Sequence, residues 1–227
     1  MAQKADSVKS IYYALGANLA VFGAKLIATL VTGSGAMMAE SLHSLADSAN
    51  QLLLLLGLRR SKRPPDEVYP LGPGKEIYFW SFILALILFT MGGCFSVYEG
   101  LHKLSHPEAL RNHWAALSVL AFAIIAETIS LRACLIEANK ARADRSLWRW
   151  FRESRQSELI VIFAEDLAAL FGLLLALVAI TATLLTGDPM YDALGSISIG
   201  LLLIVIALFI GAKVKDLLVG QGVETQT

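Results

Sequence analysis

Long apolar stretches alternate with short polar connections along most of the chain. Six of these stretches have the length of roughly 20 residues that an α-helix needs to cross about 30 Å of hydrocarbon. They cover Ser10–Val31, Gly35–Leu58, Ile77–Leu101, Trp114–Ala138, Leu159–Leu185 and Tyr191–Ala212. The pattern predicts an all-α membrane protein, built as a bundle of six transmembrane helices.

The second stretch is the least apolar, because polar residues interrupt its middle. His43 and Asp47 are four residues apart, so on an α-helix their side chains share one face, about 6 Å apart along the axis. An imidazole and a carboxylate in this arrangement supply half of a tetrahedral divalent-metal site. Glu40, Ser44 and Asn50 extend the same face. An ionisable residue at bilayer depth costs roughly 2.5 to 3.5 kcal/mol, so two on one face indicate an ion pathway.

Other charged residues also fall at membrane depth. Glu165 and Asp166 are adjacent, so their side chains point about 100° apart on a helix. We expect one to face the metal site and the other to face another helix or a water-filled cavity. Glu127 is equally compatible with pairing a buried cation and with handling protons, and Glu165 is the other candidate for handling protons. Lys25 is expected to extend its ammonium group toward the outer surface.

Several isolated polar residues have simpler interpretations. Hydrogen bonding between helices accounts for four of them: Asn18, Ser130, Ser196 and Ser198. Three histidines lie among charged residues and a proline, which favours a solvated loop over a metal site: His102, His106 and His113. The two cysteines form no CxxC pair and are interpreted as small hydrophobic residues.

Composition agrees with a membrane protein and excludes other classes. Of the 227 residues, 56% are hydrophobic and only 17% are charged. The 19 basic and 19 acidic residues balance, so net charge does not indicate nucleic-acid binding. We find no nucleophile paired with a base and no phosphate-binding loop, so the chain is not expected to be an enzyme.

The distribution of basic residues predicts how the chain is oriented. The connections between helices two and three and between helices four and five contain eleven Lys and Arg, whereas the other three contain two. The positive-inside rule therefore predicts that these two connections and both termini are cytoplasmic. Trp148 and Trp150 lie in the second basic connection, which is interpreted as an anchor at the level of the lipid headgroups.

With these residues in place, the chain resembles the cation diffusion facilitator family of metal/proton antiporters. The resemblance covers nearly the whole chain. Within the family, the chain looks more like the branch related to the animal zinc transporter nine. The motifs that carry it are Asn18, Lys25 and Gly33-Ser34 in the first hairpin, Ser41–Asp47 in the second helix, Pro70–Lys75 before the third, and Asp192–Gly200 in the sixth.

The resemblance implies a transport site with two ligands from helix two and two from helix five. His43 and Asp47 match the first pair, and Asp166 matches one member of the second. Ile162 occupies the position of the remaining ligand, which is usually histidine or aspartate, and its methyl groups cannot bind metal. Glu165, after a local shift, or water would complete the site.

The function implied is proton-coupled export of a divalent cation from the cytoplasm. Imidazole with carboxylates favours Zn²⁺ as the transported substrate, with no separate cofactor. Carriers of Mn²⁺, Fe²⁺ or Co²⁺ are the alternatives within transport, and a non-transporting membrane partner with a degenerate metal site is the alternative from another class. The resemblance also implies a homodimer in the cell (inner) membrane, and Gly92-Gly-Cys94 offers a small-residue surface for helix packing.

The sequence departs from the family pattern in one loop and at its C-terminal end. Tyr69 and Pro73 stand where many members have loop histidines, so we expect no second zinc site in that loop. The chain stops soon after Gly220, where a cytoplasmic metal-sensing domain would normally begin. We therefore expect residues 1–220 to form the transport domain and residues 221–227 a short polar tail.

Overall fold

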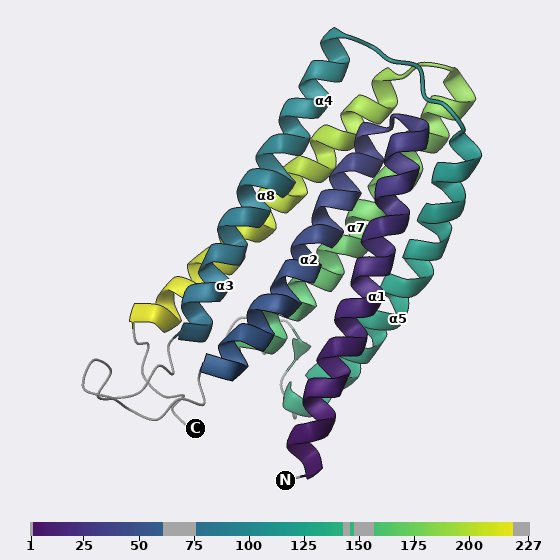
Figure 1. The fold of residues 1–227 in the computed structure, drawn as a ribbon. Coiled ribbons are helices and arrows are strands. Elements are labelled where there is room, and N and C mark those ends of the chain that lie inside the picture. The colour runs from purple at the N-terminus through teal and green to yellow at the C-terminus, as the bar shows by residue number, and fades with distance from the viewer. Residues whose placement is uncertain (1, 61–75, 143–145, 148–156, 220–227) are drawn as a thin grey trace.

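A computed structural model describes residues 2–60, 76–142, 146, 147 and 157–219. Its helices are α1 (Ala2–Thr32), α2 (Gly35–Arg60), α3 (Glu76–Ile87), the π-helix η1 (Leu88–Cys94), α4 (Phe95–Ser105), α5 (His113–Arg142), α7 (Ser157–Thr186) and α8 (Met190–Val219). Because α3, η1 and α4 run on as one rod, the described part contains six long rods (Figure 1). These rods confirm the predicted six-helix bundle.

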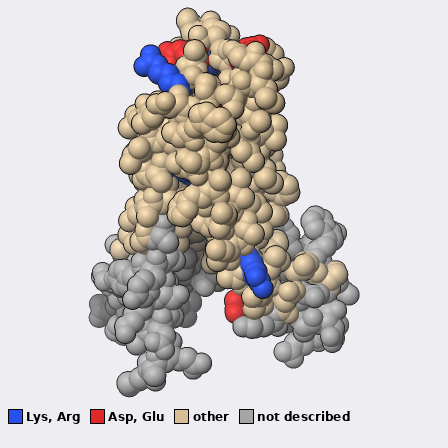
Figure 2. All heavy atoms as spheres, turned by 90° about the vertical axis from the view of Figure 1, so that its right-hand side faces the viewer, with Lys and Arg blue, Asp and Glu red and all other residues tan. Residues whose placement is uncertain are grey.

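Four of the rods are long and apolar enough to cross a membrane. They are Tyr78–Ser105, His113–Asn139, Ile162–Thr186 and Met190–Lys215. Almost all charged atoms visible in Figure 2 lie toward the two ends of that face, with a broad belt of other residues between them. The chain is therefore a multi-pass integral membrane protein, in which α2 carries the polar face that the sequence indicated.

Two tight turns pair neighbouring helices in the way the sequence predicted. Gly33, between α1 and α2, has a φ of 71°, and Gly187, between α7 and α8, has a φ of 72°. Only glycine adopts this left-handed conformation without a steric penalty. Both turns lie at the end of the bundle that also carries the α4–α5 connection, here named the turn end (Figure 1). The opposite end, where α1 begins and α8 ends, is named the terminal end.

A carboxylate from α8 fastens the turn end. Asp192 accepts hydrogen bonds from the backbone N–H groups of Gly35 (2.6 Å) and Ala36 (3.3 Å), and from the hydroxyl of Ser34. Ser34 in turn accepts a bond from the amide of Met37 at 3.1 Å, as an N-cap residue does. Lys103 Nζ lies 3.6 Å from Asp192 Oδ2. The buried N–H groups at the start of α2, which have no partner within their own helix, are thereby satisfied from α8.

Helix α8 packs closely on the α3–η1–α4 rod through glycines. A Cβ atom on Gly200 would lie 2.8 Å from the backbone nitrogen of Val97. Gly92 and Gly93 are buried, and their nearest neighbours are Leu203 and Ile204 of α8. The prediction that Gly92-Gly-Cys94 offers a small-residue surface for helix packing is therefore confirmed for both glycines, whose packing partner is α8 of the same chain. The homodimer itself stays a prediction.

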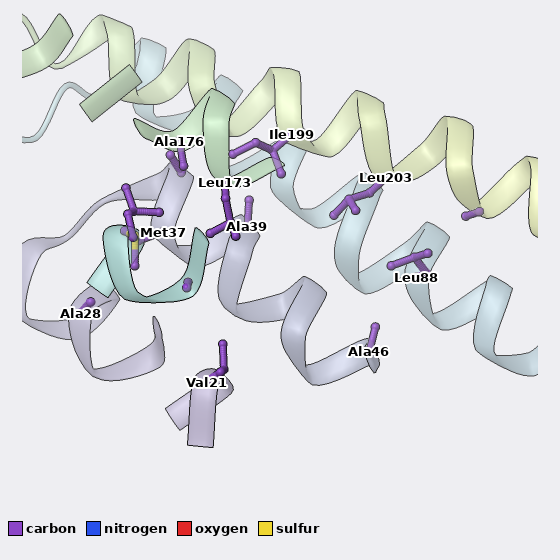
Figure 3. Close-up of a cluster of buried hydrophobic side chains, with 14 of the residues drawn as sticks. Val21, Ala28, Met37, Ala39, Ala46, Leu88, Leu173, Ala176, Ile199 and Leu203 are labelled. Carbon is purple, nitrogen blue, oxygen red and sulfur yellow. The ribbon is translucent and has the colours of Figure 1, made fainter. Parts of the chain in front are cut away.

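Small residues dominate the core where the helices meet. Side chains from all six rods form a single buried cluster, part of which is shown in Figure 3. Ala28 of α1, Ala39 of α2 and Ala176 of α7 are among its members. In a lipid environment helices associate by close van der Waals contact, which small side chains permit. This packing brings α1, α2 and α7 together around the polar face of α2.

Several predictions fall on residues outside the described part of the chain. These are the anchor with Trp148 and Trp150, the loop with Tyr69 and Pro73, and the tail 221–227.

Candidate metal-transport site

The polar face of α2 lies inside the bundle. Only 1% of the His43 side chain is exposed, and its Nε2 atom lies 3.7 Å from Oδ2 of Asp47, whose side chain is 17% exposed. Among the described residues, neither ring nitrogen of His43 has a hydrogen-bond partner. The helical spacing therefore places the imidazole and the carboxylate together, as the sequence predicted. A buried imidazole without partners is available to bind a cation, because its nitrogen lone pair is unused.

The adjacent carboxylates of α7 contact different helices. Glu165 Oε2 accepts a hydrogen bond of 2.6 Å from Nδ2 of Asn50 on α2. Asp166 Oδ2 accepts one of 3.1 Å from the hydroxyl of Ser130 on α5. The divergence follows from their separation of about 100° around the helix axis. In this conformation Glu165 is bonded to α2, although the family pattern assigns the ligand role to Asp166.

The predicted ligands are neighbours but are not gathered around one point. Asp166 interacts electrostatically with both His43 and Asp47. Among the residues that the structure describes, no three His, Cys, Asp or Glu side chains stand close enough to hold a metal ion. The assignment of His43, Asp47 and Asp166 as ligands therefore stays a prediction.

Two residues complete the surroundings of these side chains. Glu127, half-buried on α5, interacts electrostatically with Asp47, His43 and Lys25. Its position is compatible with both roles that the sequence left open. Ile162 is half-buried on α7, one turn before Asp166, and its side chain has no metal-binding atom.

A buried ion pair lies next to this group, and sequence reasoning missed it. Lys25 Nζ donates to Glu40 Oε2 at 2.9 Å, with the two side chains 0% and 1% exposed. The expectation that Lys25 extends toward the outer surface is therefore wrong. A signal was present in the sequence: Lys25 precedes Gly33 by eight residues and Glu40 follows it by seven, so a tight helical hairpin brings them level.

Of the four polar residues predicted to form hydrogen bonds between helices, two do so in the structure. Ser130 bonds across helices to Asp166, and Ser196 donates to the carbonyl of Ser96 at 2.9 Å, as predicted. Ser198 instead donates to the carbonyl of Leu194 in its own helix, so for it the interhelical role is wrong. The role of Asn18 stays a prediction.

Two of the histidines near the turn end, His102 and His106, are exposed, whereas His113, the first residue of α5, is half-buried. The rings of His102 and His106 stack with their centroids 4.9 Å apart, at the end of α4. Their exposure agrees with the solvated setting that the sequence favoured.

Comparison with known proteins gives a consistent identity for this arrangement. Residues 11–219 match the cation efflux transmembrane domain. The chain is 35% identical over 218 residues to the mitochondrial proton-coupled zinc antiporter SLC30A9 of Xenopus laevis, covering 95% of this chain and 39% of that protein. The human protein of the same name is 34% identical over 204 residues, which cover 89% of this chain and 36% of the relative.

More distant organisms contain similar proteins. Metal tolerance protein C4 of Arabidopsis thaliana is 32% identical over 226 residues, covering 97% of this chain and 49% of the relative. The chain thus spans less than half the length of these relatives. The match extends over all six rods, and the chain belongs to the cation efflux family, through its transmembrane domain.

Proposed function

We propose that this chain forms the membrane part of a proton-coupled exporter of divalent cations, with Zn²⁺ as its substrate. The observation that supports it most is the pair of His43 and Asp47, enclosed in a bundle of the cation efflux family with both imidazole nitrogens unpartnered. A cation between α2 and α7 would give one of these nitrogens the partner it lacks. Imidazole with carboxylates is a ligand set suited to Zn²⁺.

The transport step follows from competition between metal and protons. His43, Asp47 and Asp166 bind the cation when deprotonated, so binding releases protons and protonation expels the cation. Asp166 exchanges its bond with Ser130 for the metal, and Ile162 leaves the fourth position to water or to Glu165. The protons taken up belong to the group as a whole, because such close sites titrate together. A rearrangement of the helices would expose the site alternately to each side.

The proposal includes an orientation. Applied to the eleven basic residues of the two basic connections, the positive-inside rule supports a cytoplasmic terminal end, and we propose that the chain lies in a cell (inner) membrane. The cation then enters from the terminal end and leaves at the turn end.

The test is reconstitution of the purified chain in proteoliposomes, with zinc flux and internal pH followed together. Wild-type protein should move protons against zinc, and His43→Ala or Asp47→Ala should abolish both fluxes while the protein remains folded. His102→Ala is the matched control, because it removes an exposed imidazole far along the chain. Zinc flux that survives both α2 substitutions would remove the site assignment.

The same assay separates the alternatives. A competition panel with Mn²⁺, Fe²⁺ and Co²⁺ decides which metal is carried. A folded wild-type chain that moves no proton with any of these metals would instead be a non-transporting partner.

A further inference from the structure

The buried pair of Lys25 and Glu40 lies on the path between the transport site and the turn end. Glu40 precedes His43 by three residues on α2, about 4.5 Å along the axis toward the turn end. Asp47, on the other side of His43, lies toward the terminal end. An ion leaving His43 at the turn end must therefore pass Glu40.

The pair joins three helices at this level. Lys25 comes from α1 and Glu40 from α2, and they meet at 2.9 Å. On α7 the facing residue is Gly172, where an added Cβ would strike Oε1 of Glu40. The missing side chain thus makes room for the carboxylate, and the backbone of α7 closes against it.

Apolar side chains fill the space beside the pair. Met37, one turn nearer the turn end on α2, is fully buried, as is Leu173 next to Gly172. Both belong to the continuous core shown in Figure 3. A hydrated ion can pass only if these close-packed side chains move apart.

Burial is less complete in the opposite direction, although some side chains there are fully enclosed. Asp47 is 17% exposed, against 1% for Glu40, and Asn50 and Asp166 farther along are half-buried. The described conformation is therefore tighter between His43 and the turn end than between His43 and the terminal end.

Two features suit the pair to a closure that opens reversibly. Glu40 Oε1 is buried without a hydrogen-bond partner, so the carboxylate is only half satisfied where it stands. Lys25 also interacts electrostatically with His43 and Asp47, so its charge repels a cation bound there. A divalent cation that binds at His43 and Asp47 therefore weakens the ion pair between Lys25 and Glu40.

We propose that Lys25 and Glu40 are positioning residues of the transport step, forming with Gly172 the seal that closes the site from the turn end. The inference rests on the proposed function only in requiring that an ion pass His43. Separation of the ammonium from the carboxylate opens the way to the turn end, and their return closes it.

Accessibility of a reporter thiol tests the seal without zinc. Ser44, 2% exposed and beside His43, is changed to cysteine in a chain with Cys94→Ala and Cys134→Ala. A charged, membrane-impermeant thiol reagent is then added to one side at a time. Ala109→Cys, in the exposed α4–α5 connection, identifies the side that the turn end faces.

Lys25→Met should raise the labelling rate from the turn end at least tenfold, and Lys25→Arg, which keeps the charge, should leave it within threefold of the parent. Glu40→Gln should act like Lys25→Met and serves if that variant does not fold. A rise below tenfold in the folded variants, or an equal rise from both sides, would overturn the seal. Because the readout needs no zinc, it tests the seal even if the chain moves no metal.

Discussion

Glycine at position 172 ties the buried carboxylate of α2 to the backbone of α7. Lys25 holds Oε2 of Glu40, while Oε1 lies against the Cα position of Gly172. The carboxylate cannot move away from α7 without loosening a charge pair that has no solvent to replace it. A single methyl group added at this glycine should therefore disturb the packing of α1, α2 and α7.

Gly172→Ala should destabilise the folded chain by about 1–3 kcal/mol, the usual effect of overpacking a filled site. Thermal unfolding in detergent measures it. Gly23→Ala is the matched control, because a Cβ there meets nothing within 4 Å, and it should be neutral or slightly stabilising. Equal midpoints for the two variants would show that Glu40 is free to move aside.

Position 162 offers a gain-of-function change at the transport site. Ile162 lies one turn before Asp166 on α7, so Ile162→His should supply a fourth ligand. We expect zinc to bind about tenfold more tightly or better, equivalent to about 1.4 kcal/mol, in a calorimetric titration. Ile162→Leu, which adds no ligand atom, should bind as the parent does. Unchanged affinity with histidine would mean that this face of α7 does not meet α2.

The sequence identifies residues at this scale unevenly, for physical reasons. His43 and Asp47 were found because helical spacing alone fixes which face they share. Lys25 was misplaced because a long side chain in a membrane can reach either a surface or a partner, and only the packed hairpin decides between them. The different partners of Glu165 and Asp166 depend on where α2 and α5 lie around α7, which no local pattern contains.

The π-helix η1 is the least expected element of the fold. It lies within an apolar stretch whose pattern predicts one continuous α-helix. The amide of Phe95 donates to the carbonyl of Thr90, five residues earlier, whereas in an α-helix it would donate to Met91, four residues earlier. Gly92 and Gly93 fall inside it, on the side that packs against α8. The helix bounds were predictable from hydropathy, whereas this local widening depends on contact with a neighbouring element.

Close packing of α8 on α4 gives a prediction for whole elements. Gly200→Ala should lower stability by about 1–3 kcal/mol, because its Cβ would lie 2.8 Å from a backbone nitrogen that cannot swing aside. Gly211→Ala in the same helix meets only Ala85, at 3.9 Å, and should have little effect. Hydrogen exchange of α4 and α8 would localise the loss. A Gly200→Ala protein as stable as the Gly211→Ala protein would contradict this packing.

For the molecule as a whole, the bundle combines a polar interior with an apolar exterior. Most charged atoms on the face shown in Figure 2 lie near its two ends, whereas inside the bundle His43 and Asp47 lie together on α2 and Glu165 of α7 bonds to the same helix. Such groups are costly within a membrane unless they bind something. Binding, proton release and helix movement are therefore expected to occur together.

Zinc affinity should fall steeply as the pH is lowered. The ligands bind metal only when deprotonated, so protons compete with zinc at acid pH and the competition ends when the ligands are fully deprotonated. With two competing protons, the dissociation constant rises about 100-fold for each unit of pH lost within this range. Titrations between about pH 7.5 and 5.5, with the protons released counted in weakly buffered solution, measure it. An affinity that does not change with pH would exclude exchange at this site.

The most direct test of the account is anomalous density at the zinc edge from the metal-loaded protein. The account predicts one peak between α2 and α7, about 2.0–2.2 Å from a nitrogen of His43 and from carboxylate oxygens of Asp47 and Asp166. A zinc peak elsewhere in the bundle, with His43 still unpartnered, would contradict it.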